Sequence, residues 1–442
     1  MHRIINSLKK INYRMFFALL LFGLIPTVYT TVRIFLIGQL PSNYSFSIAG
    51  QLQWIHLLYE ILQEALILPL FFFIGAVVSD KEKLVNRIKT GMIFTFFLYL
   101  VLSLSIFIFA KPLVIFMAQD KNIIKETVSY IRLETIGMVF STLFKYLMVA
   151  LVTIKKDKNV YIMLLIQFII TIIFDIFFVS TLSFSLKLGV NGIALSNIIT
   201  NFILVIVAVY LLYYNDLNIL KRSKLDISWF KDLIKKGGIS GLESFVRNIA
   251  FMLMIVRMVN VVGEQGTFWV ANSFIWSWLL LPVIQLGELV KANTGEEGYD
   301  AVKDKSIGYF AITAIIVIIW FVSIPLWKPF LKDIMKISNY HDVYYIIIIS
   351  VGFYVLFAFN NVIDSIFYGL GKTNYMLFQS LVINITFYGT AFILYQTGAF
   401  APNLTLIALM FALGTALDSI LTMGMFVWMI KKTDLKFFNI NN

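Results

Sequence analysis

The chain has 442 residues, of which 60% are hydrophobic and 14% are charged, and its mean hydropathy is +0.87. Because a soluble domain carries roughly 25% charged residues, this composition excludes a water-soluble protein and indicates one that lies in lipid. The net charge of +12 does not indicate a nucleic-acid partner, since Lys and Arg lie between apolar stretches rather than on one soluble face, and the lack of cysteine excludes disulfides and thiolate metal sites.

Apolar stretches that are long enough to cross a bilayer recur from end to end of the chain. Because about 20 helical residues span the hydrocarbon core, the sequence predicts an all-α membrane protein with about twelve transmembrane helices. They fall into two series of six on either side of a polar stretch. The expected spans lie near residues 14–39, 52–78, 91–117, 128–154, 161–182 and 190–214, then 238–262, 268–290, 306–330, 342–370, 375–395 and 403–430.

The distribution of Lys and Arg predicts the topology. The first 14 residues are basic but lack a cleavage site of small residues, so we expect a retained first span rather than a signal peptide. Loops 41–50, 263–267 and 396–402 contain no Lys or Arg, whereas loop 79–90 contains several. The positive-inside rule then places both termini in the cytoplasm of a multi-pass plasma-membrane protein, such as one of the bacterial inner membrane.

The polar stretch 215–236 is predicted to be a cytoplasmic linker between an N-terminal six-helix bundle, 1–214, and a C-terminal six-helix bundle, 237–442. Apolar residues recur in it at near-helical spacing, which predicts a short amphipathic helix on the membrane surface. A solvated linker without a helix is the alternative. The apolar residues are Leu225, Ile227, Trp229, Phe230, Leu233 and Ile234.

The two series of spans resemble each other in sequence. An offset of 214 residues brings Gly23 and Arg33 onto Gly237 and Arg247, and it also superimposes two Ile-Ala-Leu triplets. Since each half has an even number of spans, both halves have the same orientation, and a pseudo-twofold axis along the membrane normal relates them. Such repeats are typical of secondary transporters, whose substrate site lies between the halves.

Charged residues inside the expected spans need a reason, because a charge at the bilayer centre costs roughly 2.5–3.5 kcal/mol. Asp175 is the most isolated of them, with Thr171 one helical turn before it. A carboxylate in this position binds a cation, binds a proton or neutralises a buried Arg. A purely structural ion pair is the simpler alternative.

Five further charged residues are candidates for lining a substrate cleft. Glu60 and Glu64 lie four residues apart and repel each other when both are ionised, unless they face water or a cation. Glu243 and Arg247 have the spacing and order of an intrahelical ion pair. Asp364 is the fifth candidate.

Three other charged residues receive simpler interpretations. Arg132 and Glu134 lie near an expected helix start, which favours positions at the membrane interface. Asp418 lies among small residues, where helices approach closely and one polar contact would suffice.

The sequence predicts neither an enzyme nor a cofactor. Its three histidines, His2, His56 and His341, are scattered, and Gly369 to Thr373 lack the spacing and the preceding strand of a phosphate-binding loop. A membrane enzyme would need an acid, a base or metal ligands clustered at one depth.

The chain resembles the multidrug and toxic compound extrusion (MATE) family, which has twelve spans in two bundles of six. The resemblance covers essentially the whole chain. It rests on Phe-Leu-Ile-Gly at 35–38, Leu-Gly-Val-Asn-Gly-Ile-Ala at 188–194, Gly-Leu-Glu-Ser at 241–244 and Gly-Leu-Gly-Lys-Thr-Asn at 369–374.

The resemblance implies a cation or proton site in the N-terminal bundle. Asp175 matches the family's second Asp, Thr171 replaces its Asn, and Ser196 or Asn197 stands at the position of its Thr. Arg33 stands where the family has its first Asp. Because an Arg stays protonated, it can pair with Asp175 and supply the charge that sodium would provide. The hypothesis is that the chain has lost the sodium site and couples to protons elsewhere, or that Asp175 exchanges partners.

The resemblance also implies a cleft that opens alternately to the two sides and expels organic, often cationic, small molecules in exchange for protons or sodium. We expect no metal other than sodium at Asp175, as the alternative to the proton, and we expect a monomer in the lipid bilayer. The competing function is a flippase for a lipid-linked saccharide or another anionic amphiphile. It is favoured by Arg33, Arg247 and Arg257.

Overall fold

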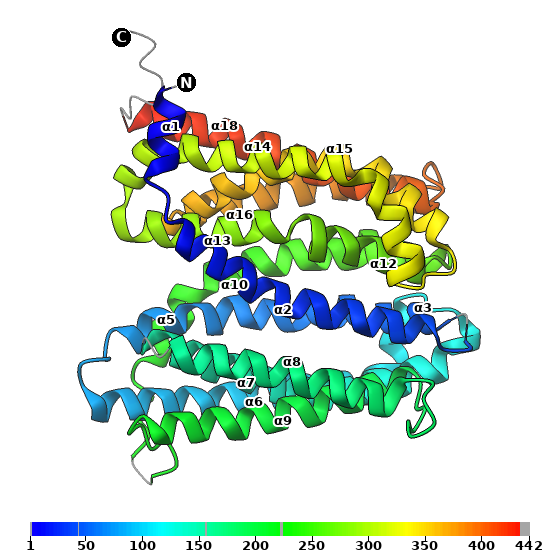
Figure 1. Ribbon diagram of the computed structural model, residues 1–442, viewed down its shortest axis with the longest axis horizontal. Helices are drawn as coiled ribbons and strands as arrows, with labels where there is room; N and C mark the ends of the chain where they lie inside the picture. Colours follow the sequence, from blue (N-terminus) through cyan, green and yellow to red (C-terminus); the bar gives the residue numbers. More distant parts are fainter. Residues whose placement is uncertain (1, 43, 155–156, 222–223, 434–442) are drawn as a thin grey trace. The chain divides into compact units, whose positions relative to one another are not determined.

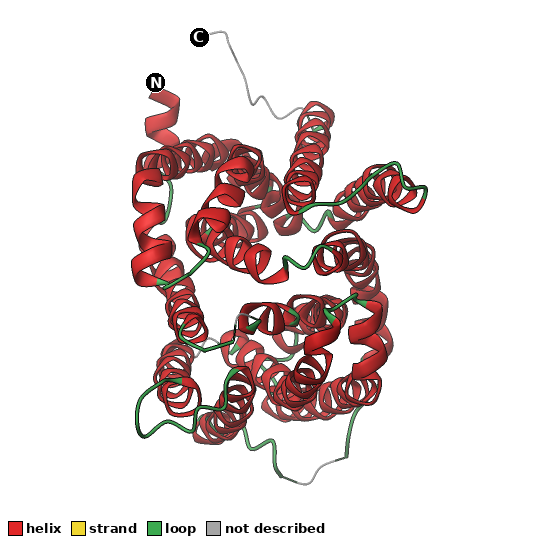
Figure 2. Cartoon of the chain, turned by 90° about the vertical axis from the view of Figure 1, so that its right-hand side faces the viewer, coloured by secondary structure: helices red, strands yellow, loops and turns green. Residues whose placement is uncertain are grey.

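The computed structural model describes residues 2–42, 44–154, 157–221 and 224–433. Within these ranges every regular element is a helix and no strand occurs (Figures 1 and 2). This agrees with the physical constraint that a chain in lipid must satisfy its backbone hydrogen bonds within each segment. The all-α fold that the composition predicted is confirmed.

The expected first half contains eleven helical elements in its described residues. Two of them are short irregular helices, the π-helical η1 and the 3-10 helix η2. The elements are α1 (His2–Lys9), α2 (Tyr13–Gly38), α3 (Ser45–Gly50), α4 (Leu52–Leu62), η1 (Gln63–Ile67), α5 (Leu68–Gly75), α6 (Lys81–Phe116), η2 (Lys121–Ile123), α7 (Ile124–Thr153), α8 (Asp157–Val179) and α9 (Val190–Tyr214).

The expected second half has more π-helical turns, labelled η3 to η6, which interrupt several of its long helices. Its described elements are α10 (Phe230–Phe251), η3 (Met252–Val256), α11 (Arg257–Val261), α12 (Gln265–Phe274), η4 (Ile275–Leu279), α13 (Leu281–Glu297), α14 (Tyr299–Pro329), η5 (Phe330–Ile334), α15 (Tyr340–Gly369), α16 (Thr373–Val382), η6 (Ile383–Tyr388), α17 (Gly389–Gln396) and α18 (Leu404–Lys432).

Ten helices in the described part of the chain are long and apolar enough to cross a membrane, or up to 11 if a pair bent by 52° at 280 counts as one span. The expected span 52–78 is not among them. It consists of α4, η1 and α5, with the π-helical turn η1 between the two α-helices.

Internal contacts divide the chain into two compact units. Unit 1 comprises Met1–Thr27 and Thr267–Asn442, and unit 2 comprises Val28–Gly266. The bundles expected from the repeat, 1–214 and 237–442, have different boundaries and stay a prediction. The difference concerns the first half of α2, which packs within unit 1, and α10 with α11, which pack within unit 2.

The short surface helix expected within 215–236 is not a separate element. Residues 224–229 are not helical, and Phe230 begins α10, which continues into the seventh span. Trp229 is 4% exposed and its ring lies 5.8 Å from that of Phe73 on α5, whereas Leu225, Ile227 and Ile234 are exposed. Hydrogen bonds from Ser228 hold the pKa of Asp226 below its ordinary value.

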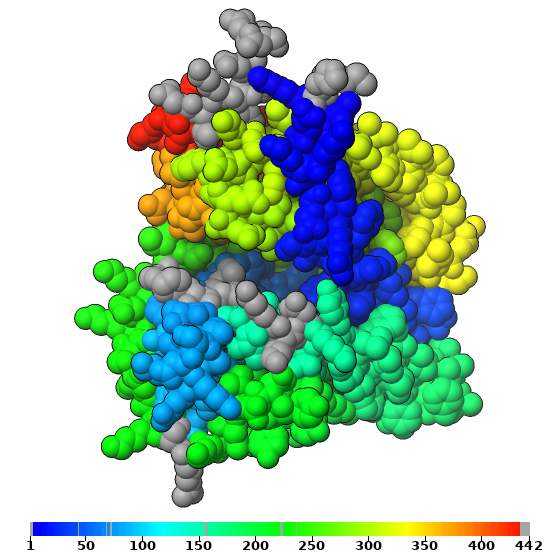
Figure 3. Space-filling view, turned by 60° about the vertical axis from the view of Figure 1, so that its left-hand side comes forward, coloured from blue at the N-terminus to red at the C-terminus, as the bar shows by residue number. Residues whose placement is uncertain are grey.

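Helix α1 is an element that the span pattern did not predict. It lies along α14 within unit 1, where Figure 3 shows it on the surface. The backbone N–H of Gly308 donates to Ser7 Oγ at 2.9 Å, and Lys10 forms an ion pair with Asp304 at 2.6 Å. A Cβ atom at Gly308 would lie 2.9 Å from Ser7 Oγ, so the missing side chain permits this docking.

The two glycines that the repeat superimposes both allow close helix packing. In unit 2, a Cβ atom at Gly237 of α10 would lie 1.7 Å from the carbonyl oxygen of Ala65 in η1. In unit 1, a Cβ atom at Gly23 of α2 would lie 2.6 Å from side-chain atoms of Leu281 and Gln285 on α13. Small residues let helix backbones approach closely in lipid. At Gly237 this approach positions α10 against η1 and α4.

Candidate functional site

Four packed helices of unit 2 bring polar side chains into an otherwise apolar interior. Helix α7 packs against α8 and α9, and α8 packs against α9 (Figure 1). The polar residues come from these three helices and from the second half of α2.

Arg33 and Asp175 form a bidentate ion pair between α2 and α8. Nε of Arg33 donates to Oδ2 of Asp175 at 2.9 Å, and Nη2 donates to Oδ1 at 3.1 Å. The side chains are 16% and 2% exposed, respectively. The contact that the sequence suggested is therefore present, with the two parallel hydrogen bonds that make Arg–carboxylate pairs strong.

The pairing limits what Asp175 can bind. Both of its carboxylate oxygens accept hydrogen bonds from a guanidinium that does not lose its proton. A sodium ion at Asp175 therefore has to displace Arg33 or approach the outer lone pairs of the carboxylate. Thr171 lies one turn before Asp175 and is buried.

Glu134 of α7 is a second buried carboxylate in this region, and it is 1% exposed. The side-chain amide of Asn197 on α9 donates to both of its oxygens, at 2.9 and 3.0 Å. The donor in both hydrogen bonds is a neutral amide, so Glu134 differs from Asp175, whose hydrogen-bond donor is a cation. Asn197, a candidate from the sequence, therefore contacts Glu134.

Glu134 faces the interior of unit 2 and Arg132 lies at the protein surface, whereas the membrane-interface position expected for both stays a prediction. Two residues along a helix correspond to about 200° of rotation, so the two side chains leave α7 on opposite sides. Nε of Arg132 donates to the carbonyl of Phe107 at 3.2 Å. Helix α7 begins at Ile124, which puts Glu134 in its third turn. In the sequence, only the two-residue spacing from Arg132 indicated that Glu134 faces the other side of the helix.

Two buried hydroxyl groups on α9 lack hydrogen-bond partners within the described chain. They are Oγ of Ser196 and Oγ1 of Thr200, which lie one helical turn apart on either side of Asn197 in sequence. A buried polar group without a partner costs roughly 1–3 kcal/mol, which is tolerated where the group serves a ligand, a proton or water. Ser196 was a candidate from the sequence, and Thr200 was not.

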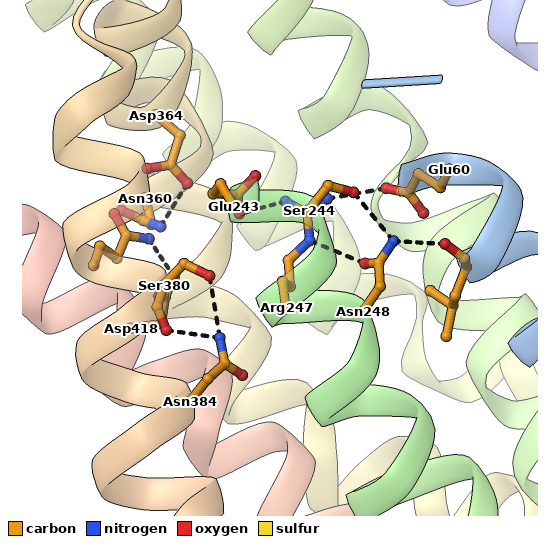
Figure 4. A network of polar contacts seen from close by, with 12 residues as sticks. Glu60, Glu243, Ser244, Arg247, Asn248, Asn360, Asp364, Ser380, Asn384 and Asp418 are labelled. Atoms are coloured by element: carbon orange, nitrogen blue, oxygen red, sulfur yellow. Dashed lines mark hydrogen bonds and ion pairs between the residues drawn. The ribbon is translucent and has the colours of Figure 1, made fainter. Parts of the chain in front are cut away.

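A second charged cluster of unit 2 joins α10 to α4 (Figure 4). Arg247 donates from Nη2 to Glu60 at 3.0 Å and from Nη1 to Glu243 at 2.9 Å. The side chains of Arg247 and Glu60 are 40% and 39% exposed, and that of Glu243 is 6% exposed. Asn248 supports the crossing by donating to the carbonyl of Leu57 at 3.0 Å. Three of the five expected cleft residues thus lie together.

Comparisons with known proteins assign this arrangement of helices. The sequence from residue 73 to 177, which contains Glu134 and Asp175, matches the model of the MatE family. An inward-facing multidrug resistance MATE family transporter of the MOP superfamily is similar in structure, with 18% identity, a TM-score of 0.74, and coverage of 93% of this chain and 96% of the other. The resemblance to the MATE family is confirmed.

Two other solved structures support the MATE fold over nearly the whole chain. An outward-facing multidrug resistance MATE family transporter has 16% identity and a TM-score of 0.72, with 99% of both chains covered. A MOP superfamily transporter from Pyrococcus furiosus has 15% identity, a TM-score of 0.67 and 99% coverage of both chains, and reverse polarity of its binding pocket suggests a different function. Among curated proteins, no sequence matches this chain. MATE proteins are transporters, not enzymes.

The other two expected cleft residues, Glu64 and Asp364, belong to other elements. Glu64 lies in η1, where the π turn changes the four-residue spacing on which its stacking with Glu60 depended. Asp364 belongs to unit 1, where Nδ2 of Asn360 donates to it at 2.9 Å (Figure 4).

Unit 1 of this MATE fold also contains a partly buried acid that the sequence treated as a packing residue. Asp418 on α18 accepts a hydrogen bond from Nε2 of Gln379 on α16 at 2.6 Å. Asp364 and Asp418 therefore both have amide partners. The sequence spacing along α18 could not reveal this contact, because the donor Gln379 lies on another helix, α16.

An aromatic cluster precedes Asp364 on α15. The ring of Trp276 lies 5.4 Å from that of Phe357 and 6.5 Å from that of Tyr354, edge to face. Phe357 and Asp364 are seven residues apart, which places them on the same side of the helix. Unit 1 thus presents aromatic rings and a carboxylate along one helix.

Proposed function

We propose that the chain is a secondary transporter that exports organic, often cationic compounds by alternating access, in exchange for protons. The observation that carries this proposal is the Arg33–Asp175 pair, at the position where the resemblance implies the coupling site. We infer a multi-pass protein of the plasma membrane with both termini in the cytoplasm, acting as a monomer and without a cofactor.

The proton is favoured over sodium as the coupling ion because a guanidinium already neutralises Asp175. Sodium needs several oxygen ligands, and the two carboxylate oxygens of Asp175 accept from Arg33. Among the described residues, no group of three or more His, Cys, Asp or Glu side chains is arranged to hold a metal ion. A proton needs only one titratable group, so it can bind to a neighbouring acid while Arg33 stays paired with Asp175.

An organic cation is favoured as the substrate by the composition of unit 1. Aromatic faces attract cations, and each such contact contributes about 0.5–2 kcal/mol depending on desolvation. Trp276, Tyr354 and Phe357 supply the rings, and Asp364 supplies a carboxylate on the same helix as two of them. The apolar walls of the spans suit the hydrophobic parts of such a compound.

The test is transport of ethidium, a fluorescent organic cation, by protein reconstituted in vesicles with separately imposed pH and sodium gradients. We expect the wild type to move ethidium with the pH gradient and to ignore the sodium gradient. Arg33→Asp, which restores the family's acid, should gain sodium dependence, and Asp175→Asn should lose transport. Absence of ethidium movement under every gradient would refute the exporter.

A flippase for an anionic amphiphile is the second candidate, and Arg247 is the observation that favours it. Of the three arginines that suggested it, Arg33 is bound to Asp175, and Arg257 donates to the carbonyl of Phe116 at 2.8 Å. Arg247 alone is both half-exposed and next to a substrate-cleft candidate. Movement of a fluorescent anionic lipid across vesicles that do not move ethidium would support this function instead.

A further inference from the structure

The buried polar region of unit 2 has one negative charge in excess when all its carboxylates are ionised. It contains the Arg33 guanidinium and the carboxylates of Asp175 and Glu134. Arg33 donates two hydrogen bonds to Asp175, so the charges of these two residues neutralise each other. The excess charge therefore resides on Glu134, which has only neutral donors.

We propose that Glu134 binds and releases the coupling proton and that Asn197 is its positioning residue. This inference rests on the proposed proton-coupled transport and names the group that performs it. On protonation, one carboxylate oxygen of Glu134 gains an O–H bond and the carboxylate becomes a neutral acid. The site then has no net charge, which matches the low-polarity surroundings of α7.

Asp175 is unsuited to this task because its protonation would leave a buried guanidinium without a counterion. Breaking a buried pair by removing one partner costs about 3–5 kcal/mol, since the remaining charge stays uncompensated. Glu134 pays no such cost, because its partner Asn197 is neutral in both states. An amide that donates to a carboxylate can still donate to the carbonyl oxygen of the protonated acid.

The charges around Glu134 also allow the proton to leave. The charged groups near Glu134 are Arg33 on α2, whose charge favours the ionised form, and Asp175 on α8, whose charge opposes it. Tyr130 lies one turn earlier on α7, and Tyr59 on α4 is a further titratable neighbour. Helix α9 contributes only amides and hydroxyls near Asn197. A group with attraction from one cation and neutral donors elsewhere is able to exchange its proton.

The hydroxyls on α9 without partners supply a second, independent observation. Ser196 and Thr200 flank Asn197 within one helical turn, and their oxygens are buried without hydrogen bonds in the described chain. Hydroxyls both accept and donate, so they suit a protonated acid or a water that carries its proton. If the hydroxyls of Ser196 and Thr200 form hydrogen bonds only when Glu134 is protonated, they lack partners when Glu134 is ionised.

The direct test measures protonation rather than transport. Infrared difference spectra of the purified protein during acidification should show the carbonyl band of a buried protonated carboxylic acid. We expect the first such band to vanish in Glu134→Gln and to remain in Glu126→Gln, which changes an exposed acid of the same helix. Persistence of that first band in Glu134→Gln would overturn the proposal.

Asn197→Ala tests the positioning role and also covers the case in which Glu134→Gln does not fold. Loss of the amide removes a donor to the ionised form, so the band should appear at higher pH than in the wild type. A residue with a purely structural role would leave the pH of the band unchanged. An unchanged pH in Asn197→Ala would exclude Asn197 as a positioning residue.

Vesicle transport separates this proposal from the proposed function. Glu134→Gln should still exchange ethidium across the membrane without a gradient but should no longer accumulate it with a pH gradient. If the wild type moves no ethidium at all, the exporter is wrong, and the infrared band still decides whether Glu134 titrates. If Glu134→Gln couples to the pH gradient as the wild type does, Glu134 is not the proton site.

Discussion

Arg33 and Arg247, which the offset of 214 residues superimposes, lie in different surroundings. Both make an ion pair with an N–O distance of 2.9 Å. The side chain of Arg33 is 16% exposed and faces a carboxylate that is 2% exposed, whereas that of Arg247 is 40% exposed and shared between two acids. One residue type at equivalent positions thus forms a closed pair and an open cluster.

The difference teaches that burial, more than pairing, decides what an intramembrane arginine can do. In the buried pair, desolvation makes separation expensive, so Arg33 serves as a fixed charge that holds α2 to α8. In the open cluster, Arg247 and Glu60 are both about 40% exposed, so we expect their contact to be exchanged at less cost than the Arg33–Asp175 pair, although the second partner, Glu243, is 6% exposed. The predictions below test this contrast, beginning with the largest effect.

Removal of Arg33 should have the largest effect on stability. Arg33→Gln leaves the Asp175 carboxylate buried without its counterion, and we expect a loss of about 3–5 kcal/mol of unfolding free energy. Asp175→Asn should cost a similar amount for the same reason. The measurement is chemical or thermal unfolding of the purified protein in detergent.

The double variant Arg33→Gln with Asp175→Asn is the control for this prediction. It removes both charges, so it should be more stable than either single variant, and the cycle gives the coupling energy. Equal and additive losses in the single and double variants would contradict the closed pair.

The Gly237 contact, which brings α10 and thus Arg247 to α4, should give the second largest effect. Gly237→Ala places a Cβ atom on the carbonyl of Ala65, where backbone must shift, and we expect a loss of about 1–3 kcal/mol. The neighbouring Gly238 has no atom within 4 Å of its Cβ position. Gly238→Ala is therefore the matched control and should be neutral or stabilising, because Ala favours helix.

If both variants unfold alike, close packing at Gly237 does not position α10. If Gly237→Ala lowers the stability, α10 has moved away from α4 and the Arg247–Glu60 contact is weakened. A contribution of Glu60 to substrate binding should then also change in this variant.

Much of the fold follows from the sequence because lipid permits few solutions. Helices over the apolar stretches were predictable, since each segment must satisfy its own backbone. The division of span 52–78 by η1 was not predictable, because a π turn has no periodic pattern of its own. The docking of α1 depends on the missing side chain of Gly308 on a distant helix, which spacing along α1 does not reveal.

The candidate site was predictable only where its chemistry is unusual. Asp175 in an apolar run demanded a partner, and Arg33 was the cation at the family's coupling position. The sequence did not identify Glu134 as a site residue. The expected start of its span, at 128, put it near the interface, whereas α7 begins at Ile124. Its partner Asn197 comes from another helix, so the contact required the packing of α7 on α9.

Replacement of Arg247 should have the smallest effect on stability and a clear one on binding. Because Arg247 and Glu60 are about 40% exposed, we expect Arg247→Gln to lower the unfolding free energy by less than Arg33→Gln does, with the buried Glu243 as the main source of the loss. The variant leaves Glu60 and Glu243 without this cation, so ethidium should bind more tightly and with a stronger dependence on salt. Fluorescence titration at two salt concentrations measures both. A loss of stability as large as that of Arg33→Gln would mean that exposure does not distinguish the two arginines, and unchanged ethidium affinity would place the open cluster outside the substrate path.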